Sequence, residues 1–266
     1  MFRHHTPIES YLVRGTEVLV KRDDLYGSWP APPLGKLRGA RVLLRKLFDG
    51  GTRLVGCWDT RISALGQGIA ACCSELPGMN ALLTYPAKKG CEVPRPLQVA
   101  ESLGAEVLGV RAGRITISFS EGRKVVENRG GTMLPFGLEC AEAVYAVSSE
   151  AGLVPPSCTH GGTVVLCAGS GVTLAGLLLG LRGQPSRFIA ASSGRSPRSI
   201  ARCLRKYGAF TSSEIHIEPA RCPYSEPIRQ DCPFPSHPHY DLKAWRLLCE
   251  EIDHLAKPIL FWNVGS

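Results

Sequence analysis

The stretch TVVLCAGSGVTLAGLLLGL, residues 163–181, predicts a buried strand, a glycine turn and a helix in immediate succession. Residues 163–167 are β-branched or apolar, which is typical of a strand covered on both faces. A Gly-Ser-Gly turn follows at 169–171, and Thr173 opens a segment whose leucines recur at helical spacing. Glycines let neighbouring N–H groups point the same way, and a helix N-terminus adds partial positive charge. The stretch therefore predicts a phosphate cradle, or else a tight turn with no ligand.

Two familiar phosphate-binding patterns fit this loop poorly. No Gly-Lys-Ser/Thr follows the turn, as a Walker A loop requires. The dinucleotide pattern G-x-G-x-x-G is met only in part, by Gly169 and Gly171, because Leu174 stands at the third place. That pattern usually opens a dinucleotide-binding fold, whereas here it comes late in the chain. The loop alone does not identify the phosphate.

Outward from this stretch, short apolar runs alternate with helical patterns over most of the chain. We expect strands within 17–25, 52–57, 80–86, 105–110, 131–136, 162–169, 186–192, 213–219 and 258–265. We expect helices within 63–76, 92–103, 114–129, 139–151, 173–182, 196–207 and 240–254. This alternation predicts an α/β protein with mostly parallel sheets covered on both faces. The proline-rich stretch 219–239 is expected to be an ordered loop.

The composition is that of a globular protein with one large domain or two closely packed ones. The chain has 266 residues, of which 44% are hydrophobic and 20% charged. It has no run of about 20 apolar residues, and its first ten residues lack the apolar core of a signal peptide. We therefore expect a cytoplasmic protein that does not enter membranes. Eleven cysteines form no C-x-x-C pattern, so we expect reduced, packed thiols and no metal site.

A lysine stands at an unfavourable place in PPLGKLRGARVLL, residues 32–44. Lys36 lies between a stiff Pro-Pro-Leu-Gly entry and a segment with helical periodicity. A positive charge at a helix start opposes the helix dipole, since the exposed N–H groups there are already partly positive. We infer that something other than helix stability placed this lysine.

These segments, in this order, resemble the fold-type-II pyridoxal-phosphate enzymes, the tryptophan-synthase β-like group. The resemblance is to the aminocyclopropane-carboxylate deaminase and D-cysteine desulfhydrase branch. VLVKRDDLYG (18–27) is similar to its first strand, HPHYDLKAW (237–245) to its proline-tyrosine-acid-x-lysine element, and PILFWNVGS (258–266) to its last strand. The resemblance spans nearly the whole chain. It implies two open, mostly parallel twisted sheets with helices on both faces, in a large cofactor-binding domain (1–48 and 146–266) and a smaller substrate-side α/β domain (49–145).

The same resemblance implies a cofactor site for pyridoxal 5'-phosphate. Lys36 would form the Schiff base with the cofactor aldehyde, which only a primary amine can do. The cofactor phosphate would be held by the turn and the helix start, through Gly169, Ser170, Gly171, Val172 and Thr173.

Two residues of the HPHYDLKAW element would complete the site. Asp241 would lie against the pyridine nitrogen and keep it protonated, and Tyr240 would act as an acid or base or orient the substrate. An ordinary helix N-terminus with Asp241 in its acidic first turn is the alternative explanation of this element.

One element departs from the branch, namely its Ser-Asn motif, which grips the substrate carboxylate. The corresponding stretch here is GCWDTRISALGQGIA, residues 56–70. Thr60, Arg61 and Ser63 are the nearest groups for binding a substrate, but they do not match the motif one to one. Ring-opening deamination of a cyclopropane amino acid therefore does not follow from the resemblance.

Arginines recur at helical spacing in two places. Arg195, Arg198, Arg202 and Arg205 fall on one face of a predicted helix that follows the strand after the glycine turn. Arg38, Arg41 and Arg45 make a second stripe after Lys36. Such stripes are typical of solvated helix faces, and they also suit a large anion such as nucleic acid, with a formal net charge of +8.

We therefore expect a pyridoxal-phosphate-dependent lyase that forms a carbanion at the α carbon of an amino acid or aminoacyl group, by decarboxylation, deamination or elimination. Compact proteins resembling this branch occur in bacteriophages that hypermodify thymine. The alternative is therefore the same chemistry, above all decarboxylation, on an amino acid attached to thymine in phage DNA, in the host cytoplasm, with the target base out of the stack. A second alternative is a non-catalytic or nucleic-acid-binding protein of this fold. By analogy with the family we expect a homodimer.

Overall fold

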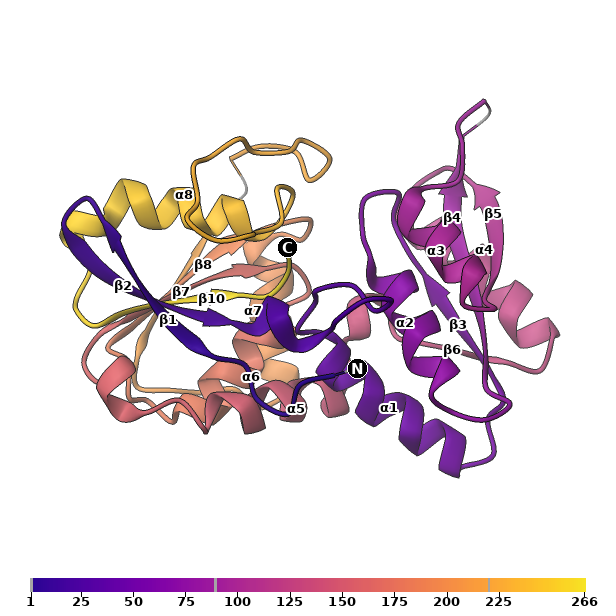
Figure 1. Cartoon of the computed structure of the whole chain (residues 1–266), viewed down its shortest axis with the longest axis horizontal. Coiled ribbons are helices and arrows are strands. Elements are labelled where there is room, and N and C mark those ends of the chain that lie inside the picture. Colours follow the sequence, from indigo (N-terminus) through magenta and orange to yellow (C-terminus); the bar gives the residue numbers. More distant parts are fainter. Residues whose placement is uncertain (1, 89, 220) are drawn as a thin grey trace. The chain divides into compact units, whose positions relative to one another are not determined.

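The computed structural model describes residues 2–88, 90–219 and 221–266, and the chain divides into two compact units (Figure 1). Unit 1 comprises Gly27–Pro32 and Ala40–Leu138, and unit 2 comprises Phe2–Tyr26, Pro33–Gly39 and Glu139–Ser266. The breaks at 39/40 and 138/139 differ from the sequence-based domain boundaries at 48/49 and 145/146. The first break falls inside a continuous helix, which a periodicity pattern cannot reveal.

Unit 2 contains a six-stranded sheet with the order β1-β2-β10-β7-β8-β9. These strands are β1 (Ile8–Val13), β2 (Thr16–Arg22), β7 (Thr163–Ala168), β8 (Arg187–Ser192), β9 (Glu214–Glu218) and β10 (Ile259–Asn263). Only β1 is antiparallel to its neighbour, and the other pairs are parallel. Every residue of the central strand β7 is buried, as its unbroken apolar sequence predicts.

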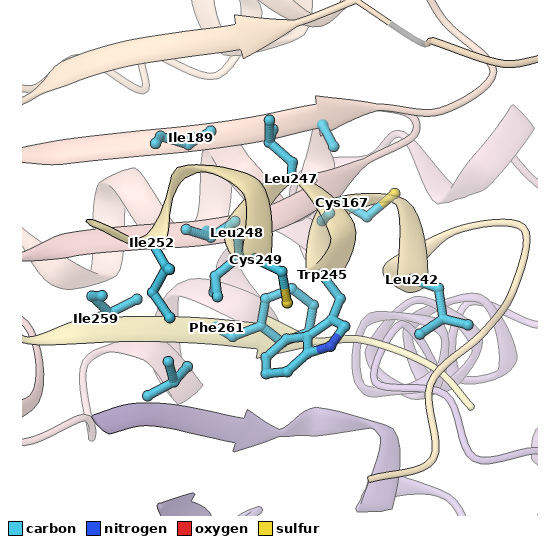
Figure 2. Packing of buried hydrophobic residues seen from close by; sticks show 14 of the residues in the cluster. Cys167, Ile189, Leu242, Trp245, Leu247, Leu248, Cys249, Ile252, Ile259 and Phe261 are labelled. Carbon is cyan, nitrogen blue, oxygen red and sulfur yellow. The ribbon is translucent and has the colours of Figure 1, made fainter. Parts of the chain in front are cut away.

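The helices of unit 2 cover both faces of this sheet. They are α5 (Ala141–Ala151), α6 (Val172–Leu181), α7 (Pro197–Lys206) and α8 (Asp241–Glu251), with short 3₁₀ turns η1 (Asp23–Tyr26), η3 (Pro156–Cys158) and η4 (Ile252–His254). In Figure 1, α8 lies on one face and α5 and α6 on the other. Figure 2 shows the core beneath α8, where the ring of Trp245 lies against Phe261 of β10 with centroids 5.2 Å apart.

Unit 1 contains a four-stranded parallel sheet with the order β5-β4-β3-β6. Its strands are β3 (Leu54–Trp58), β4 (Asn80–Ala87), β5 (Glu106–Arg111) and β6 (Thr132–Met133). Its helices are α2 (Leu65–Ser74), α3 (Arg95–Ser102) and α4 (Ile115–Asn128), with the 3₁₀ turn η2 (Phe136–Leu138). Gly66 of α2 packs near Leu83 and Gly122 of α4 near Thr84. Because neighbouring residues of a strand face opposite ways, α2 and α4 cover opposite faces.

Every strand and helix expected from the sequence is present, which confirms two mostly parallel α/β sheets. Helix α1 (Leu37–Asp49) follows Lys36 and contains the break between the units. Strand β1 was not expected. Its residues are at most half-buried, and it reaches β2 through a hairpin turn with positive φ angles at Arg14 and Gly15.

Two absences among the described residues bear on the sequence-based expectations. No helix in 2–88, 90–219 or 221–266 is long and apolar enough to cross a membrane. The same part of the chain contains no cluster of three or more His, Cys, Asp or Glu side chains that could hold a metal ion. All eleven cysteines are free thiols.

A buried cluster of charged side chains connects β2, the start of α1 and α5 in unit 2. Lys21 Nζ lies 2.5 Å from Glu150 Oε1, and both side chains are almost fully buried. Arg38 contacts Asp23 Oδ1 at 2.7 Å and Glu150 Oε2 at 3.2 Å. Burial alone would raise the pKa of Glu150, but the bonds from Lys21 and from the amide of Thr6, with the charge of Arg38, lower it overall. Glu150 is therefore an ionised centre between two buried cations.

We predict that Glu150→Ala lowers the free energy of unfolding by about 3–5 kcal/mol, because it leaves Lys21 buried without its anion. Glu214→Ala is the matched control, since Glu214 pairs with Arg187 at 2.7 Å on the exposed surface. The control should cost less than about 1 kcal/mol. Chemical denaturation followed by circular dichroism measures both. Equal losses in the two variants would show that the buried cluster contributes no more than a surface pair.

Candidate cofactor site

The glycine turn between β7 and α6 is shaped by close contact with α7. Gly171 has a φ of +92°, in the left-handed region that favours glycine, and it caps the N-terminus of α6. A Cβ at Gly171 would lie 3.0 Å from the Cβ of Cys203 and 3.4 Å from Cγ2 of Ile200. Gly171 offers no side chain to the first amides of α6, and the first turn holds no acidic residue. These amides are therefore available to an anion.

Lys36 stands at the entry to α1, held by backbone bonds to the last residues of the chain. The N–H of Gly35 donates to Val264 O at 2.7 Å. A side chain at Gly35 would overlap the buried carboxylate of Asp23, so only glycine fits directly before Lys36. Lys36 Nζ lies 4.0 Å from the position that a Cβ of Gly169 would take. The amine and the glycine turn are thus brought together within unit 2.

Asp241 is a buried carboxyl group at the first position of α8. It is 2% exposed and accepts the backbone N–H groups of Val264 at 3.2 Å and Gly265 at 3.1 Å. Burial raises the pKa of Asp241 to about 7, although the two amides and the charge of Lys36 act in the opposite direction. The carboxyl group therefore has no counter-ion close enough to offset its loss of water. A cationic ring nitrogen placed against it would supply one.

Tyr240 is joined to a second tyrosine that the sequence analysis did not single out. The hydroxyl groups of Tyr240 and Tyr224 share a hydrogen bond, and their rings meet edge to face with centroids 5.3 Å apart. The ring of His237 lies 4.8 Å from Tyr240, and burial, followed by the nearby His239, lowers the pKa of His237 to about 4. Tyr224 belongs to the proline-rich stretch 219–239, of which residue 220 lies outside the described residues. The only signal in the sequence that could have pointed to Tyr224 is that it lies in a proline-rich loop expected to be ordered.

Thr60, Arg61 and Ser63 lie together in the loop that enters α2 of unit 1. Thr60 Oγ1 accepts the N–H of Ser63 at 3.1 Å, and Ser63 Oγ accepts that of Leu65 at 3.1 Å. Arg61 Nη2 donates to the carbonyl oxygen of Glu92 at 2.8 Å. These contacts shape the loop, and the substrate-binding role of the three residues stays a prediction.

Asp59, one residue earlier in the same loop, has a buried side chain at the start of α2. Its Oδ1 accepts the N–H of Thr60 at 2.8 Å and its Oδ2 the N–H of Gly66 at 2.5 Å. The Asp59 carboxylate therefore already accepts the backbone N–H groups that an external anion would bind.

The predicted arginine stripes differ in their partners. Arg38 is buried and paired with Asp23 and Glu150, contrary to the exposed position expected for a nucleic-acid contact. Arg41 pairs with Glu75 at 3.0 Å on the surface of unit 1. The carboxylate of Glu139 pairs with Arg195 and, at 3.3 Å, with Lys206. Three arginines of the first stripe remain exposed, namely Arg198, Arg202 and Arg205.

The residues of unit 2 fit pyridoxal phosphate at three separate points. The N-terminal amides of α6 and the buried hydroxyl-bearing residues Ser170 and Thr173 suit its phosphate. The amine of Lys36 suits its aldehyde. The buried carboxyl of Asp241 suits a protonated pyridine nitrogen. An ordinary helix N-terminus would explain the position of Asp241 but not its burial without a counter-ion.

Comparison with known proteins gives one curated relative. The chain is 30% identical over 282 residues to the glycyl-dTMP PLP-dependent decarboxylase of Pseudomonas phage M6, and the alignment covers 100% of both chains. No protein-family model matches the chain.

Solved structures share the fold at low sequence identity. An ACC deaminase homologue matches with a TM-score of 0.82 at 20% identity, covering 99% of this chain and 90% of that one. A hydrogen sulfide-producing enzyme of Fusobacterium nucleatum matches with a TM-score of 0.72 at 15% identity, over 98% and 93% of the two chains. Diaminopropionate ammonia lyase of Escherichia coli gives 0.69 at 15% identity, over 99% and 83%.

The raised pKa of Asp241 predicts a specific pH dependence of stability in the cofactor-free protein. Between the ordinary value of 3.8 and about 7 the folded chain holds a proton that the unfolded chain has lost. Stability from this group is therefore complete below 3.8 and is lost as the pH rises through about 7. The free energy of unfolding of the wild type, relative to Asp241→Asn, should fall by about 2 kcal/mol between pH 5 and pH 7.

Denaturant unfolding of both cofactor-free proteins at the two pH values measures this difference. The exposed Asp253 supplies the control variant Asp253→Asn, for which the difference should stay constant. A pH-independent difference for Asp241→Asn as well would mean that Asp241 is ionised throughout this range.

Proposed function

The chain belongs to the pyridoxal-phosphate-dependent enzymes of fold type II, in the family of the phage M6 decarboxylase, and we propose that it removes carbon dioxide from an aminoacyl group carried on a thymine nucleotide. It is a pyridoxal-phosphate-dependent lyase. The proposed substrate follows the relative's name, glycyl-dTMP. Chemistry on a base within DNA would further require that base to leave the stack or to be single-stranded.

The observation that carries this proposal is the convergence of three groups at one edge of the unit 2 sheet. Lys36 Nζ lies 4.0 Å from the Cβ position of Gly169, and its charge acts on the buried carboxyl of Asp241. A lysine, an anion cradle and a buried acid serve no evident purpose for folding, because a lysine at a helix start and an unpaired buried carboxyl both cost stability.

Each residue has a distinct part in the proposed reaction. Bound pyridoxal phosphate supplies an electron sink that stabilises negative charge at the α carbon when carbon dioxide leaves. Lys36 would hold the aldehyde end of the cofactor through its amine, and the amides of Gly171 and Val172 would hold its phosphate. Asp241 would keep a proton on the pyridine nitrogen, which would strengthen the electron sink. Tyr240, which is hydrogen-bonded to Tyr224, would return a proton to the α carbon.

Asp59 supports decarboxylation over a reaction that retains the carboxylate. In the resembling deaminase branch, the loop before the second helix grips the substrate carboxylate. Here the carboxylate of Asp59 takes the N–H groups of Thr60 and Gly66 and is 3% exposed. A buried negative charge in this loop opposes the binding of a second carboxylate.

We predict that the purified protein supplied with pyridoxal phosphate converts glycyl-dTMP to a product lacking carbon dioxide, as measured by mass spectrometry. Free glycine and free alanine are the comparison substrates and should react far more slowly. Loss of ammonia in place of carbon dioxide, or faster turnover of the free amino acids, would contradict the proposal.

We predict that pyridoxal phosphate gives the wild type an absorption band at roughly 410–430 nm, as expected of a lysine-bound cofactor. Lys36→Ala should abolish both this band and the conversion of glycyl-dTMP. Lys46→Ala, on the exposed surface of the same helix, should retain both. A band that survives in Lys36→Ala would assign the cofactor to another lysine.

A further inference from the structure

The outer face of α7 carries three exposed arginines. Arg198, Arg202 and Arg205 are spaced by four and three residues, which places them on one side of the helix. The segment PRSIARCLRK contains no acidic residue. Within residues 2–88, 90–219 and 221–266, no carboxylate forms an ion pair with any of the three. We call these three side chains the α7 basic strip.

The basic residues beside the strip are engaged differently. Arg195 and Lys206, just outside its two ends, both pair with Glu139. Glu139 therefore pairs with the flanking basic residues and forms no ion pair with the three arginines of the strip. A helix face that served only solubility would gain from mixed charges, whereas uniform positive charge attracts an anionic partner.

The position of Arg198 supports a binding role over helix stability. It is the second residue of α7, and the first turn contains no acid. Positive charge there opposes the helix dipole. The N-terminus is instead stabilised by Ser196, whose hydroxyl accepts the N–H of Ser199 at 3.3 Å. The Ser196 cap therefore stabilises a helix start that the charge of Arg198 destabilises.

The opposite face of α7 contacts the glycine turn of the candidate cofactor site. Ile200, Cys203 and Leu204 are buried, and the first two lie within 3.4 Å of a Cβ placed at Gly171. One helix therefore carries the phosphate turn on its inner side and the basic strip on its outer side. A polymer bound along the strip would run one helix diameter, about 10 Å, from the turn.

An exposed aromatic residue follows the strip. Phe210 is 74% exposed and lies four residues beyond the end of α7. A ring exposed to this extent is unfavourable in water, and it is the kind of surface on which an unpaired base stacks. Arginines followed by an exposed aromatic ring match the chemistry of a nucleic-acid strand, with phosphates and bases in alternation.

We propose that the α7 basic strip, with Phe210, binds the sugar-phosphate backbone of a DNA strand whose modified thymine enters the cofactor site. This inference rests on the proposed function for the choice of DNA as the partner. The strip would supply affinity independent of base sequence, because phosphate contacts carry no sequence information. Selection of the modified base would remain with the cofactor site.

The direct test is binding of an unmodified, fluorescently labelled single strand of about 20 nucleotides, longer than one typical binding site. We compare the wild type with the triple variant Arg198→Gln, Arg202→Gln and Arg205→Gln by anisotropy over a salt series. Loss of three phosphate contacts should weaken binding about 100-fold near 0.1 M salt and reduce the slope of log K against log salt by about 2. Phe210→Ala should weaken binding further with no change of slope.

A matched variant separates the strip from net charge. Arg95→Gln, Lys124→Gln and Arg182→Gln removes the same three charges from exposed positions elsewhere, lowering the formal charge from +8 to +5 in both triple variants. This control should bind the strand within about threefold of the wild type. Equal losses in the two triple variants, or no loss in either, would overturn the inference.

Activity measurements distinguish failure of the strip from failure of the proposed function. The α7 triple variant should convert the mononucleotide glycyl-dTMP at the wild-type rate but lose conversion of the same group within an oligonucleotide. Equal conversion of the oligonucleotide by both proteins would overturn the role of the strip. If the wild type converts neither substrate, the proposed function fails, while the salt series still decides whether the strip binds a strand.

Discussion

The ion pair between Arg38 and Asp23 fixes the start of α1, and the position of Lys36 depends on it. Arg38 follows Lys36 by two residues and contacts Asp23 Oδ1 at 2.7 Å. The other oxygen of the same carboxylate lies where a side chain of Gly35 would be. Asp23 therefore constrains the residues on both sides of Lys36. The backbone at Lys36 is therefore held in place, so its flexible side chain extends from a fixed point.

Two buried carboxyl groups in unit 2, Glu150 and Asp241, have opposite electrostatic surroundings. The difference distinguishes a carboxylate that stabilises the fold from one that suits a ligand. Glu150 lies between Lys21 and Arg38, so its pKa is lowered and it stays charged. Burial raises the pKa of Asp241 to about 7, because two backbone amides and the charge of Lys36 do not offset the lost water, and the charge of Asp24 adds to the rise. A group with satisfied charge can only hold the fold together. A carboxyl without a counter-ion can bind a cationic ligand atom and respond to it.

Local patterns in the sequence predicted the elements well, and the candidate cofactor residues rest on equally local patterns. The turn at Gly169 and Gly171, the lysine at a helix start and the acid at the start of α8 each carry their signal within a few residues. The pairing of charges carries no such signal. Arg38 and Arg195 look alike in a helical stripe, but their partners Asp23 and Glu139 stand 15 and 56 residues away. Tyr224 was missed for the same reason, since its contact with Tyr240 spans a proline-rich loop.

The formal charge of +8 therefore acquires meaning only after pairing is taken into account. Lys21 and Arg38 are buried in unit 2 and paired with carboxylates, so their charges contribute little to the attraction of a partner in solution. Arg198, Arg202 and Arg205 retain their field because no carboxylate within the described segments pairs with them. Their helix also closes over Gly171, so its sequence must satisfy an apolar inner face and a free outer face. The two requirements together explain a helix that buries Ile200, Cys203 and Leu204, exposes three arginines and contains no acidic residue.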